Sequence, residues 1–503
     1  MKRATGVLLS VTSLPSPYGI GCFSKEAYDF VDWLVEARQT YWQILPLGPT
    51  AYGESGDSPY QAYSAFAGNP YLIDLTPFIE KGYLSKKDLS KRNMTRNASQ
   101  VDYDKLHQYR YELLHIAYEK SQIHLDPDYQ KFIKENAWWL DDYSLFMALH
   151  NFFKDVKWQD WPEDIRLRYA YSLDYYRKEL YFDIEFQKFL QYHFFSQWHA
   201  LKEYANKKGI QIVGDMPIYV SLDSADVWSH PELFQLNEDL SLKAMAGCPP
   251  DMFSETGQVW GNPLYNWDYH KQTNYQWWTS RVWSSFQMFD VCRIDHFRGF
   301  DEYYSIPAGE ETAIHGHWEK GPSLELFQSI EKAIGKRHFM AEDLGFQSEG
   351  VRQLVKNSGY PNMKVFQFGF DPEDSGATND YLPHNYHMNC WAYTGTHDND
   401  TTIGWYKSLS KKEQALVLDY LGKTELADEE ITWSMIRAIF QSHAIVTIVP
   451  MQDYLSLDSC ARMNLPSTAT GNWSWRMKKG STTKKLAQQM KKLALIYGRA
   501  NWN

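Results

Sequence analysis

The sequence predicts an α/β fold: a (β/α)8 TIM barrel with helical and loop-rich insertions and no C-terminal β-sandwich domain. Three observations support this fold class. With 503 residues, the chain is long enough for one large barrel that carries insertions. Short apolar segments alternate with segments of helical periodicity, which is typical of parallel sheets. Eight such β–α units can be counted along the chain, and this number indicates a TIM barrel.

The first unit and the strand after it set the pattern. Residues 7–11 are a short apolar run and predict the first strand. Ser24 has the residue type of an N-cap, and the apolar residues of 27–34 recur at helical spacing. Residues 41–47 predict the second strand. A strand, a helix and a strand in this order predict two parallel neighbours in one sheet.

Two long segments then interrupt the alternation. Residues 50–200 are mostly charged and aromatic at helical spacing, and they predict a mostly helical insertion after the second strand. Residues 210–220 predict the third strand, with Asp215 in its second half. Residues 221–275 predict a second insertion, which contains a loop rich in glycine and proline at 247–262.

The alternation resumes with the fourth strand, which begins at residue 291 and ends in charged residues. Strands five to eight are predicted at residues 338–344, 364–370, 390–396 and 444–450. Segments of helical spacing separate several of them, and a lysine-rich helix is predicted near residues 483–497. We therefore expect residues 1–503 to form a single domain around one barrel.

Composition argues against several classes of protein. The net charge of −11 and the absence of a long Lys/Arg stripe argue against nucleic acid as the main partner. No apolar run approaches the roughly 20 residues of a membrane span. The five cysteines are scattered and form no C-x-x-C pair, which favours a reducing, cytoplasmic location. The oligomeric state is left open.

Aromatic residues make up 16% of the chain, although the mean hydropathy is only −0.54. A bulky interior is the simpler explanation, and we expect the pairs Trp138-Trp139 and Trp277-Trp278 to serve packing. The low hydropathy, however, indicates that many rings lie beside polar groups. That mixture suits a ligand with apolar faces and a rim of hydroxyl groups, such as a sugar.

Acidic residues stand near the C-terminal ends of four predicted strands: Asp215, Asp295, Glu342 and Asp398. These strand ends converge at one face of a TIM barrel. Glycosidic bond cleavage needs one carboxylate as nucleophile or base and one carboxylic acid as proton donor. A divalent metal would recruit carboxylates in the same way. The nearby cationic residue Arg293 argues against a metal, but the two alternatives stay open at this point, as does a purely structural Arg293–Asp295 pair.

Other residues favour structural explanations. Asp343 follows Glu342 on a strand, so its side chain is expected on the opposite side, in a structural hydrogen bond. His315 and His317 lack a third ligand and are expected at the surface. No glycine-rich dinucleotide turn follows a predicted strand, so we expect no cofactor.

Eight motifs in one order resemble those of a known family. They are Ser58-Pro59-Tyr60-Gln61, Gly214-Asp215-Met216-Pro217-Ile218-Tyr219, Pro249-Pro250-Asp251, Trp260-Gly261-Asn262-Pro263, Arg293-Ile294-Asp295-His296-Phe297-Arg298-Gly299, Ala341-Glu342-Asp343-Leu344-Gly345, Thr396-His397-Asp398-Asn399-Asp400 and Gly471-Asn472-Trp473. The chain resembles the amylomaltases, which are 4-α-glucanotransferases of glycoside hydrolase family 77 in the α-amylase clan. The resemblance implies one catalytic barrel that uses no cofactor and no metal.

The resemblance also implies roles for the residues in these motifs. Asp295 would be the nucleophile, Glu342 the general acid and base, and Asp398 the group that holds the hydroxyls of the distorted sugar. The implied substrate-binding residues are Tyr60, Asp215, Trp260, Arg293, His397 and Asn472. Arg293 would keep Asp295 ionised, since a nearby cation lowers a carboxyl pKa.

The activity implied is transfer of a segment of an α-1,4-glucan to the 4-hydroxyl of glucose or another maltooligosaccharide, with retention at the anomeric carbon. We expect loop 247–262, with Met252, Phe253 and Trp260, to cover the cleft and exclude water. In a retaining enzyme the carboxyls of Asp295 and Glu342 would lie about 5–5.5 Å apart.

Overall fold

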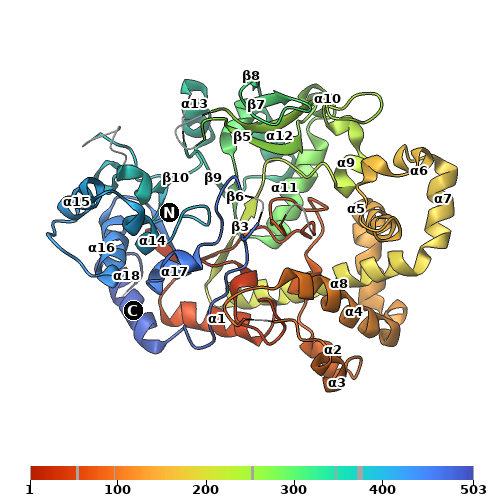
Figure 1. The fold of residues 1–503 in the computed structure, drawn as a ribbon, viewed down its shortest axis with the longest axis horizontal. Coiled ribbons are helices and arrows are strands. Elements are labelled where there is room, and N and C mark those ends of the chain that lie inside the picture. Colours follow the sequence, from red (N-terminus) through yellow and green to blue (C-terminus); the bar gives the residue numbers. More distant parts are fainter. Residues whose placement is uncertain are drawn as a thin grey trace.

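In the computed structural model, which describes residues 2–52, 56–95, 97–250, 254–345, 348–370, 378–468 and 470–501, eight parallel strands close into a central barrel (Figure 1). The strands are β1 (Ala4–Leu8), β2 (Tyr41–Gln43), β3 (Gln211–Met216), β6 (Val291–Ile294), β9 (Phe339–Ala341), β10 (Asn362–Val365), β11 (Cys390–Tyr393) and β12 (Val446–Pro450). Each pairs with its predecessor, and β12 closes the ring by pairing with β1. The predicted fold class is therefore confirmed.

Helices of the β–α units surround the barrel. They are α1 (Lys25–Glu36), α8 (Tyr181–Lys207), α11 (Gln276–Met288), α12 (Ser323–Ile334), α13 (Glu349–Ser358), α16 (Asp428–Gln441) and α18 (Lys484–Ile496). Between β10 and β11 the described residues form 3-10 turns at Phe366–Phe370 and Pro383–Asn385 instead of an α-helix. The predicted sixth strand thus ends at Val365, five residues earlier than its apolar run suggests, because buried 3-10 turns can be as apolar as strands.

The segment between β2 and β3 is helical. It contains α2 (Thr76–Glu80), α3 (Lys86–Ser90), α4 (Tyr103–Ser121), α5 (Pro127–Phe152), α6 (Glu163–Arg166) and α7 (Ala170–Glu179), and α8 then returns to the barrel. Asp102 and Asp126 cap α4 and α5 with their carboxylates, which explains where these helices begin. Within the described ranges, α5 and α8 included, we find no helix with the length and apolarity that crossing a membrane requires.

The same helical segment is tied to the chain that follows β3. His150 of α5 lies 3.0 Å from Asp223 and 3.3 Å from Asp155, and its side chain is buried. Burial lowers the pKa of His150, but the two carboxylates outweigh this effect and raise it to about 9. The imidazole is therefore charged at neutral pH and joins α5 to the segment beyond β3.

A second, smaller sheet lies outside the barrel and was not predicted. Its strands are β4 (Ala244–Cys248), β5 (Gln258–Pro263), β7 (Glu302–Pro307) and β8 (His317–Lys320), in the order β5-β4-β7-β8. Residues 258–262 of the predicted loop 247–262 therefore belong to a strand, while Met252 and Phe253 lie outside the described residues. His315 and His317 are exposed, as predicted.

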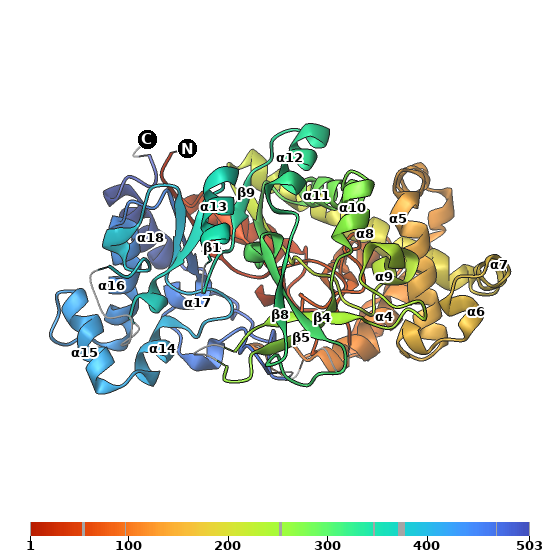
Figure 2. The ribbon, with the colours of Figure 1, turned by 90° about the horizontal axis from the view of Figure 1, so that it is seen from above.

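The remaining helices are α9 (Ala225–Ser229), α10 (Trp267–Gln272), α14 (Thr402–Ser408), α15 (Lys411–Tyr420) and α17 (Met451–Tyr454). Figures 1 and 2 show α5, α6 and α7 at one end of the molecule and α14, α15 and α16 at the other. The small sheet stands between these ends, beside the barrel (Figure 2). The barrel therefore has helices at both ends of the molecule and the small sheet at its side.

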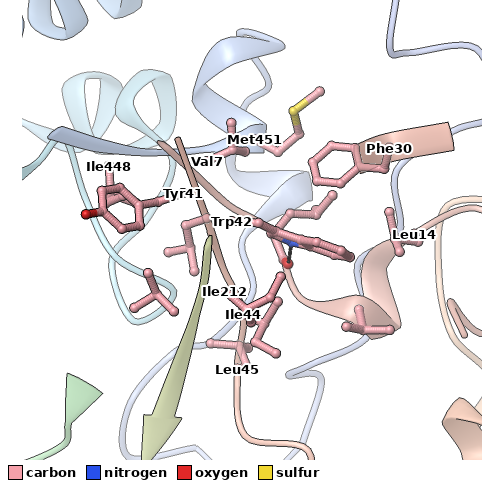
Figure 3. Close-up of a cluster of buried hydrophobic side chains, with 14 of the residues drawn as sticks. Val7, Leu14, Phe30, Tyr41, Trp42, Ile44, Leu45, Ile212, Ile448 and Met451 are labelled. Carbon is pink, nitrogen blue, oxygen red and sulfur yellow. Dashed lines mark hydrogen bonds between the residues drawn. The ribbon is translucent and has the colours of Figure 1, made fainter. Parts of the chain in front are cut away.

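The layer between the barrel wall and its helices is closely packed around Trp42 (Figure 3). Trp42 of β2 has no exposed surface, and its indole N–H donates a 2.8 Å hydrogen bond to the carbonyl oxygen of Leu9. Phe30 of α1 meets the indole edge-on at a centroid distance of 5.1 Å. This one side chain therefore joins β2, the end of β1 and α1.

We predict that Trp42→Ala lowers the free energy of unfolding by about 3–5 kcal/mol, because it removes a buried ring and leaves a cavity. Trp42→Phe should cost less, since it retains a ring and loses the N–H donor. Trp283, which is 43% exposed on α11, is the matched control, and Trp283→Ala should change the value by less than about 0.5 kcal/mol. Urea denaturation measures all three, and similar losses for Trp42→Ala and Trp283→Ala would contradict the described packing.

Candidate active site

The four acidic residues singled out in the sequence lie at or just beyond the C-terminal ends of β3, β6, β9 and β11. Asp215 and Arg293 are register partners on the neighbouring strands β3 and β6, so their side chains start from the same side of the sheet. Asp295 follows β6, and Glu342 follows β9. Arg293 contacts the carboxylates of these three residues, so they face a common space.

Arg293 lies at the centre of this space, with only 3% of its side chain exposed. Its Nη1 lies 2.7 and 2.8 Å from the two oxygens of Asp215 and 2.9 Å from Oδ1 of Asp295. Its Nη2 lies 3.9 Å from Oε2 of Glu342. Sequence reasoning paired Arg293 with Asp295 alone, whereas the structure places its shortest contact on Asp215. The guanidinium offsets charge from three carboxylates at once.

Tyr60 connects this network to His397, which follows β11, the seventh strand of the barrel. Its hydroxyl donates a 2.7 Å hydrogen bond to Oδ2 of Asp215 and lies 2.7 Å from Nε2 of His397. The hydroxyl has one proton, and the Asp215 carboxylate can only accept. His397 must therefore carry a proton on Nε2, where the Tyr60 oxygen and, at 3.2 Å, Oδ2 of Asp398 can both accept it. The contacts fix the tautomer of a neutral His397.

His397 and Asn464 hold Asp398. Nε2 of His397 lies 3.2 Å from Oδ2 of Asp398, and the Asn464 amide donates a 2.7 Å hydrogen bond to Oδ1. Burial works against ionisation of Asp398, but these neighbours outweigh it, so its pKa is held below the ordinary range. In return, Asp398 raises the pKa of His397 against the effect of burial. Asp398 is therefore ionised across the range in which proteins are stable.

Glu342 is held by the backbone. The N–H groups of His296 and Leu344 donate to its two carboxyl oxygens, at 2.8 and 2.7 Å. His296 can do this because it has a left-handed conformation with φ 50° and ψ 50°, directly after Asp295. Burial raises the pKa of Glu342, while Arg293 and the two N–H groups lower it, and the net shift is upward. A carboxyl with a raised pKa is suited to donate a proton.

The surroundings of Asp295 shift the pKa of its carboxyl in opposite directions. Arg293 does lower its pKa, but burial and the charges of Asp215 and Glu342 raise it more, to about 7. Arg293 thus favours the ionised form of Asp295, and its role in keeping Asp295 ionised stays a prediction. The guanidinium prevents a larger upward shift.

The two remaining predicted binding residues differ in their surroundings. Trp260 of β5 meets the ring of His296 edge-on at a centroid distance of 4.9 Å. It therefore lies beside the turn at His296, whose N–H donates to Glu342. Asn472 uses its side chain within its own loop, where it accepts from the N–H of Leu465 and donates to Thr468. Its predicted contact with substrate stays a prediction.

Three residues near the site were missed by sequence reasoning. Trp473 is buried, and its ring lies 5.6 Å from Tyr60 and 6.0 Å from His397. It stands in the Gly-Asn-Trp motif, so that motif contained the signal, although the neighbouring residue was chosen. Asn464 carried no recognisable signal, because its role depends on a loop contact. His296 stands in the motif that contains Asp295, but its role depends on a backbone conformation that the motif does not reveal. Asp343 binds Asn362 at 2.8 Å, as the structural hydrogen bond predicted for it requires.

The arrangement is suited to acid and nucleophile chemistry at one carbon atom. Among the described residues no cluster of three or more His, Cys, Asp and Glu side chains is placed to hold a metal ion. The space between Asp215, Asp295 and Glu342, where a divalent cation would bind, contains the Arg293 guanidinium. The arrangement thus offers a carboxylate that can attack (Asp295), a carboxylic acid that can donate a proton (Glu342) and an ionised carboxylate that can bind hydroxyl groups (Asp398).

Comparisons with known proteins point to one family. A family model described as 4-alpha-glucanotransferase matches residues 9–483. The 4-alpha-glucanotransferase of Clostridium butyricum is 48% identical over 493 residues, which cover 98% of this chain and 100% of that protein. The 4-alpha-glucanotransferase of Thermus thermophilus is 44% identical and covers 98% of each. The structure of an amylomaltase from Streptococcus agalactiae in complex with acarbose is similar with a TM-score of 0.95 and 42% identity, covering 99% of this chain and 100% of that one.

We predict that Tyr60→Phe lowers the free energy of unfolding by about 1–3 kcal/mol, because it removes a hydrogen bond to the buried Asp215 carboxylate and an acceptor for His397. Tyr171→Phe is the matched control, since Tyr171 is 66% exposed and should tolerate the change with a loss under about 0.5 kcal/mol. Urea denaturation of both variants distinguishes them. Equal stabilities would mean that the Tyr60 hydroxyl does not bridge the two groups.

Proposed function

We propose that this chain, which belongs to the 4-alpha-glucanotransferase family, transfers a segment of an α-1,4-glucan to the 4-hydroxyl of glucose or another maltooligosaccharide through a covalent glycosyl–Asp295 intermediate. The chain is an enzyme of this class on a TIM barrel. The observation that supports this mechanism is one guanidinium, that of Arg293, in contact with the carboxyls of both Asp295 and Glu342. We place the reaction in maltodextrin, glycogen or starch metabolism, in the cytoplasm.

In the first step Asp295 attacks the anomeric carbon from the face opposite the scissile bond. Arg293 contacts Oδ1 of Asp295, so we assign the attack to Oδ2. The bond between the anomeric carbon and the leaving 4-oxygen breaks, and the carboxyl proton of Glu342 goes to that oxygen. An ester between Asp295 and the glucan remains, while the shortened chain leaves with a free 4-hydroxyl.

In the second step the 4-hydroxyl of an acceptor attacks the same carbon. Its proton goes to the Glu342 carboxylate, and the electron pair of the ester bond returns to Asp295, so both residues are restored. Two inversions give retention. Water could replace the acceptor, and exclusion of water from the cleft favours transfer. The expected separation of about 5–5.5 Å between the two carboxyls stays a prediction.

The other residues of the site bind the sugar whose bond is broken. We assign to Asp398 the hydroxyls next to the anomeric carbon, because its low pKa keeps it a charged acceptor. Tyr60 and Trp473 offer ring surface beside His397, and Asp215 orients Arg293. We further propose that residues 1–503 form one catalytic domain in which residues 50–200 and 221–275 are insertions, with the 247–262 segment covering the cleft.

Incubation with pure maltotriose tests the activity. We expect a series of longer maltooligosaccharides together with glucose, because the intermediate passes its glucan to another sugar. A product mixture of glucose and maltose alone would indicate hydrolysis and would contradict the proposal. In the same assay Asp295→Asn should lower kcat by at least about 10,000-fold, since it removes the nucleophile. A variant that retained transfer at a near-normal rate would refute the assignment of Asp295.

The pH dependence of kcat/KM tests the electrostatics. Asp295 must be ionised to attack, so kcat/KM should rise as pH increases through its pKa, which burial raises to about 7. Glu342 must be protonated, so kcat/KM should fall as pH increases through its raised pKa. We expect a bell-shaped profile whose acidic limb lies well above pH 4, the ordinary value for an aspartate. An acidic limb at or below pH 4 would contradict a raised pKa of Asp295.

A further inference from the structure

A second cavity lies outside the catalytic residues, between α5, α9 and the region of α10 and α11. Its volume is about 300 Å³, at the lower end of the range for small-molecule sites. Its lining includes none of Asp295, Glu342 and Asp398. Figure 1 shows α9 between α5 and α10, which locates the cavity toward the helical insertion. It adjoins the cavity that contains Tyr60 and Asp215, with which it shares Ser64 and Phe66, but it does not include the three catalytic candidates.

The cavity brings together one member of each tryptophan pair noted in the sequence. Trp138 and Trp277 both line it, and Phe66 lies between them, with its ring edge-on to each at centroid distances of 4.9 and 6.0 Å. Trp139 and Trp278 are buried, as expected of packing residues, whereas Trp138 is 46% exposed. Trp138 thus packs against Phe66 and also leaves a large apolar ring face open to a ligand.

Polar groups at the rim are arranged for a neutral ligand. The carboxylate of Asp142 lies 2.7 Å from the guanidinium of Arg168, and that of Glu232 lies 3.3 Å from the imidazole of His230. Each of these two carboxylates has a basic partner. The third acidic residue of the lining, Asp226, accepts from the N–H of Ala65, and burial raises its pKa, so the rim presents hydrogen-bonding oxygens without a strong net charge. An ionic ligand would gain little from such a rim, while hydroxyl groups can bind to it.

One donor in the lining lacks an acceptor. The indole N–H of Trp277 is covered from solvent, and among the described residues no atom accepts its hydrogen bond. A buried donor without an acceptor costs about 1–3 kcal/mol, and a ligand oxygen accepts from this N–H only after the side chains that cover it shift. Rings with open faces, hydroxyl-binding oxygens and a free donor together match one class of ligand, which has apolar C–H faces and a rim of hydroxyls.

We propose that this cavity binds a glucosyl unit of an α-glucan, away from the catalytic carboxylates. The proposal rests on the proposed function for the identity of the sugar, because that activity makes α-glucans the neutral polyhydroxylated ligands this chain meets. Trp138 supplies the stacking face, Trp277 donates through its N–H, and Asp142 and Glu232 accept from sugar hydroxyls. The site adds a contact for long glucans that a short substrate such as maltotriose does not need.

Isothermal titration of the full chain with maltoheptaose tests the proposal. Asp295→Asn serves as the background, so that the glucan is bound and not converted. We expect two binding events, one of which is lost or weakened at least tenfold by adding Trp138→Ala. Trp283→Ala is the matched control, because Trp283 is an equally exposed tryptophan on α11 outside the lining, and it should leave both events unchanged. Trp277→Phe should weaken the same event about tenfold while retaining a ring.

A single binding event that is unaffected by Trp138→Ala and Trp277→Phe would overturn the proposal, and so would two events that both survive these changes. Trp138→Ala in the otherwise unaltered chain should keep kcat on maltotriose within about twofold and raise KM for long glucans several-fold. Failure of the proposed function would look different: Asp295→Asn would still transfer, whatever the titration shows. A crystal of the Asp295→Asn protein soaked in maltoheptaose should show a sugar ring over Trp138.

Discussion

The mouth of the barrel depends on one buried guanidinium. Arg293 contacts three carboxylates that come from β3, from the end of β6 and from the end of β9. Without a cation, three negative charges this close together, one of them fully buried, would be strongly unfavourable, and protonation of these carboxylates would remove their charge. The strand register makes the arrangement possible, because Asp215 and Arg293 stand directly opposite each other on neighbouring strands. The barrel thus supplies both the charges and the position of the group that balances them.

The segments that connect the barrel strands supply aromatic side chains to the site. Tyr60 comes from the chain after β2, Trp260 from the small sheet, and Trp473 from the segment before α18. Their rings surround the charged groups, and the burial to which they contribute raises the pKa of Asp295 and of Glu342. The acid–base properties of residues on the barrel are therefore set in part by segments that are not part of it. A change in an insertion can alter the chemistry without contacting a reacting atom.

Much of this organisation could be predicted from residue patterns. The strands were recognisable because parallel strands buried on both faces are short apolar runs, and their C-terminal acids pointed to one face. The small sheet was missed because β8 is short and mostly exposed, and because β4 and β5 flank a segment rich in glycine and proline. The contact of Arg293 with Asp215 was missed because it joins residues 78 positions apart. The position of Asn464 beside Asp398 depends on how a loop returns to the barrel, which no local pattern reveals.

The left-handed turn at His296 has a consequence for sequence variation. The hold on Glu342 comes from the N–H groups of His296 and Leu344, and a main-chain donor is the same for every residue type except proline. The position of the acid is thus robust to mutation of the side chains at both sites. What restricts residue choice at 296 is the backbone conformation, which disfavours β-branched residues. In related sequences the side chains at positions 296 and 344 can therefore change while the backbone N–H groups still hold Glu342 in place.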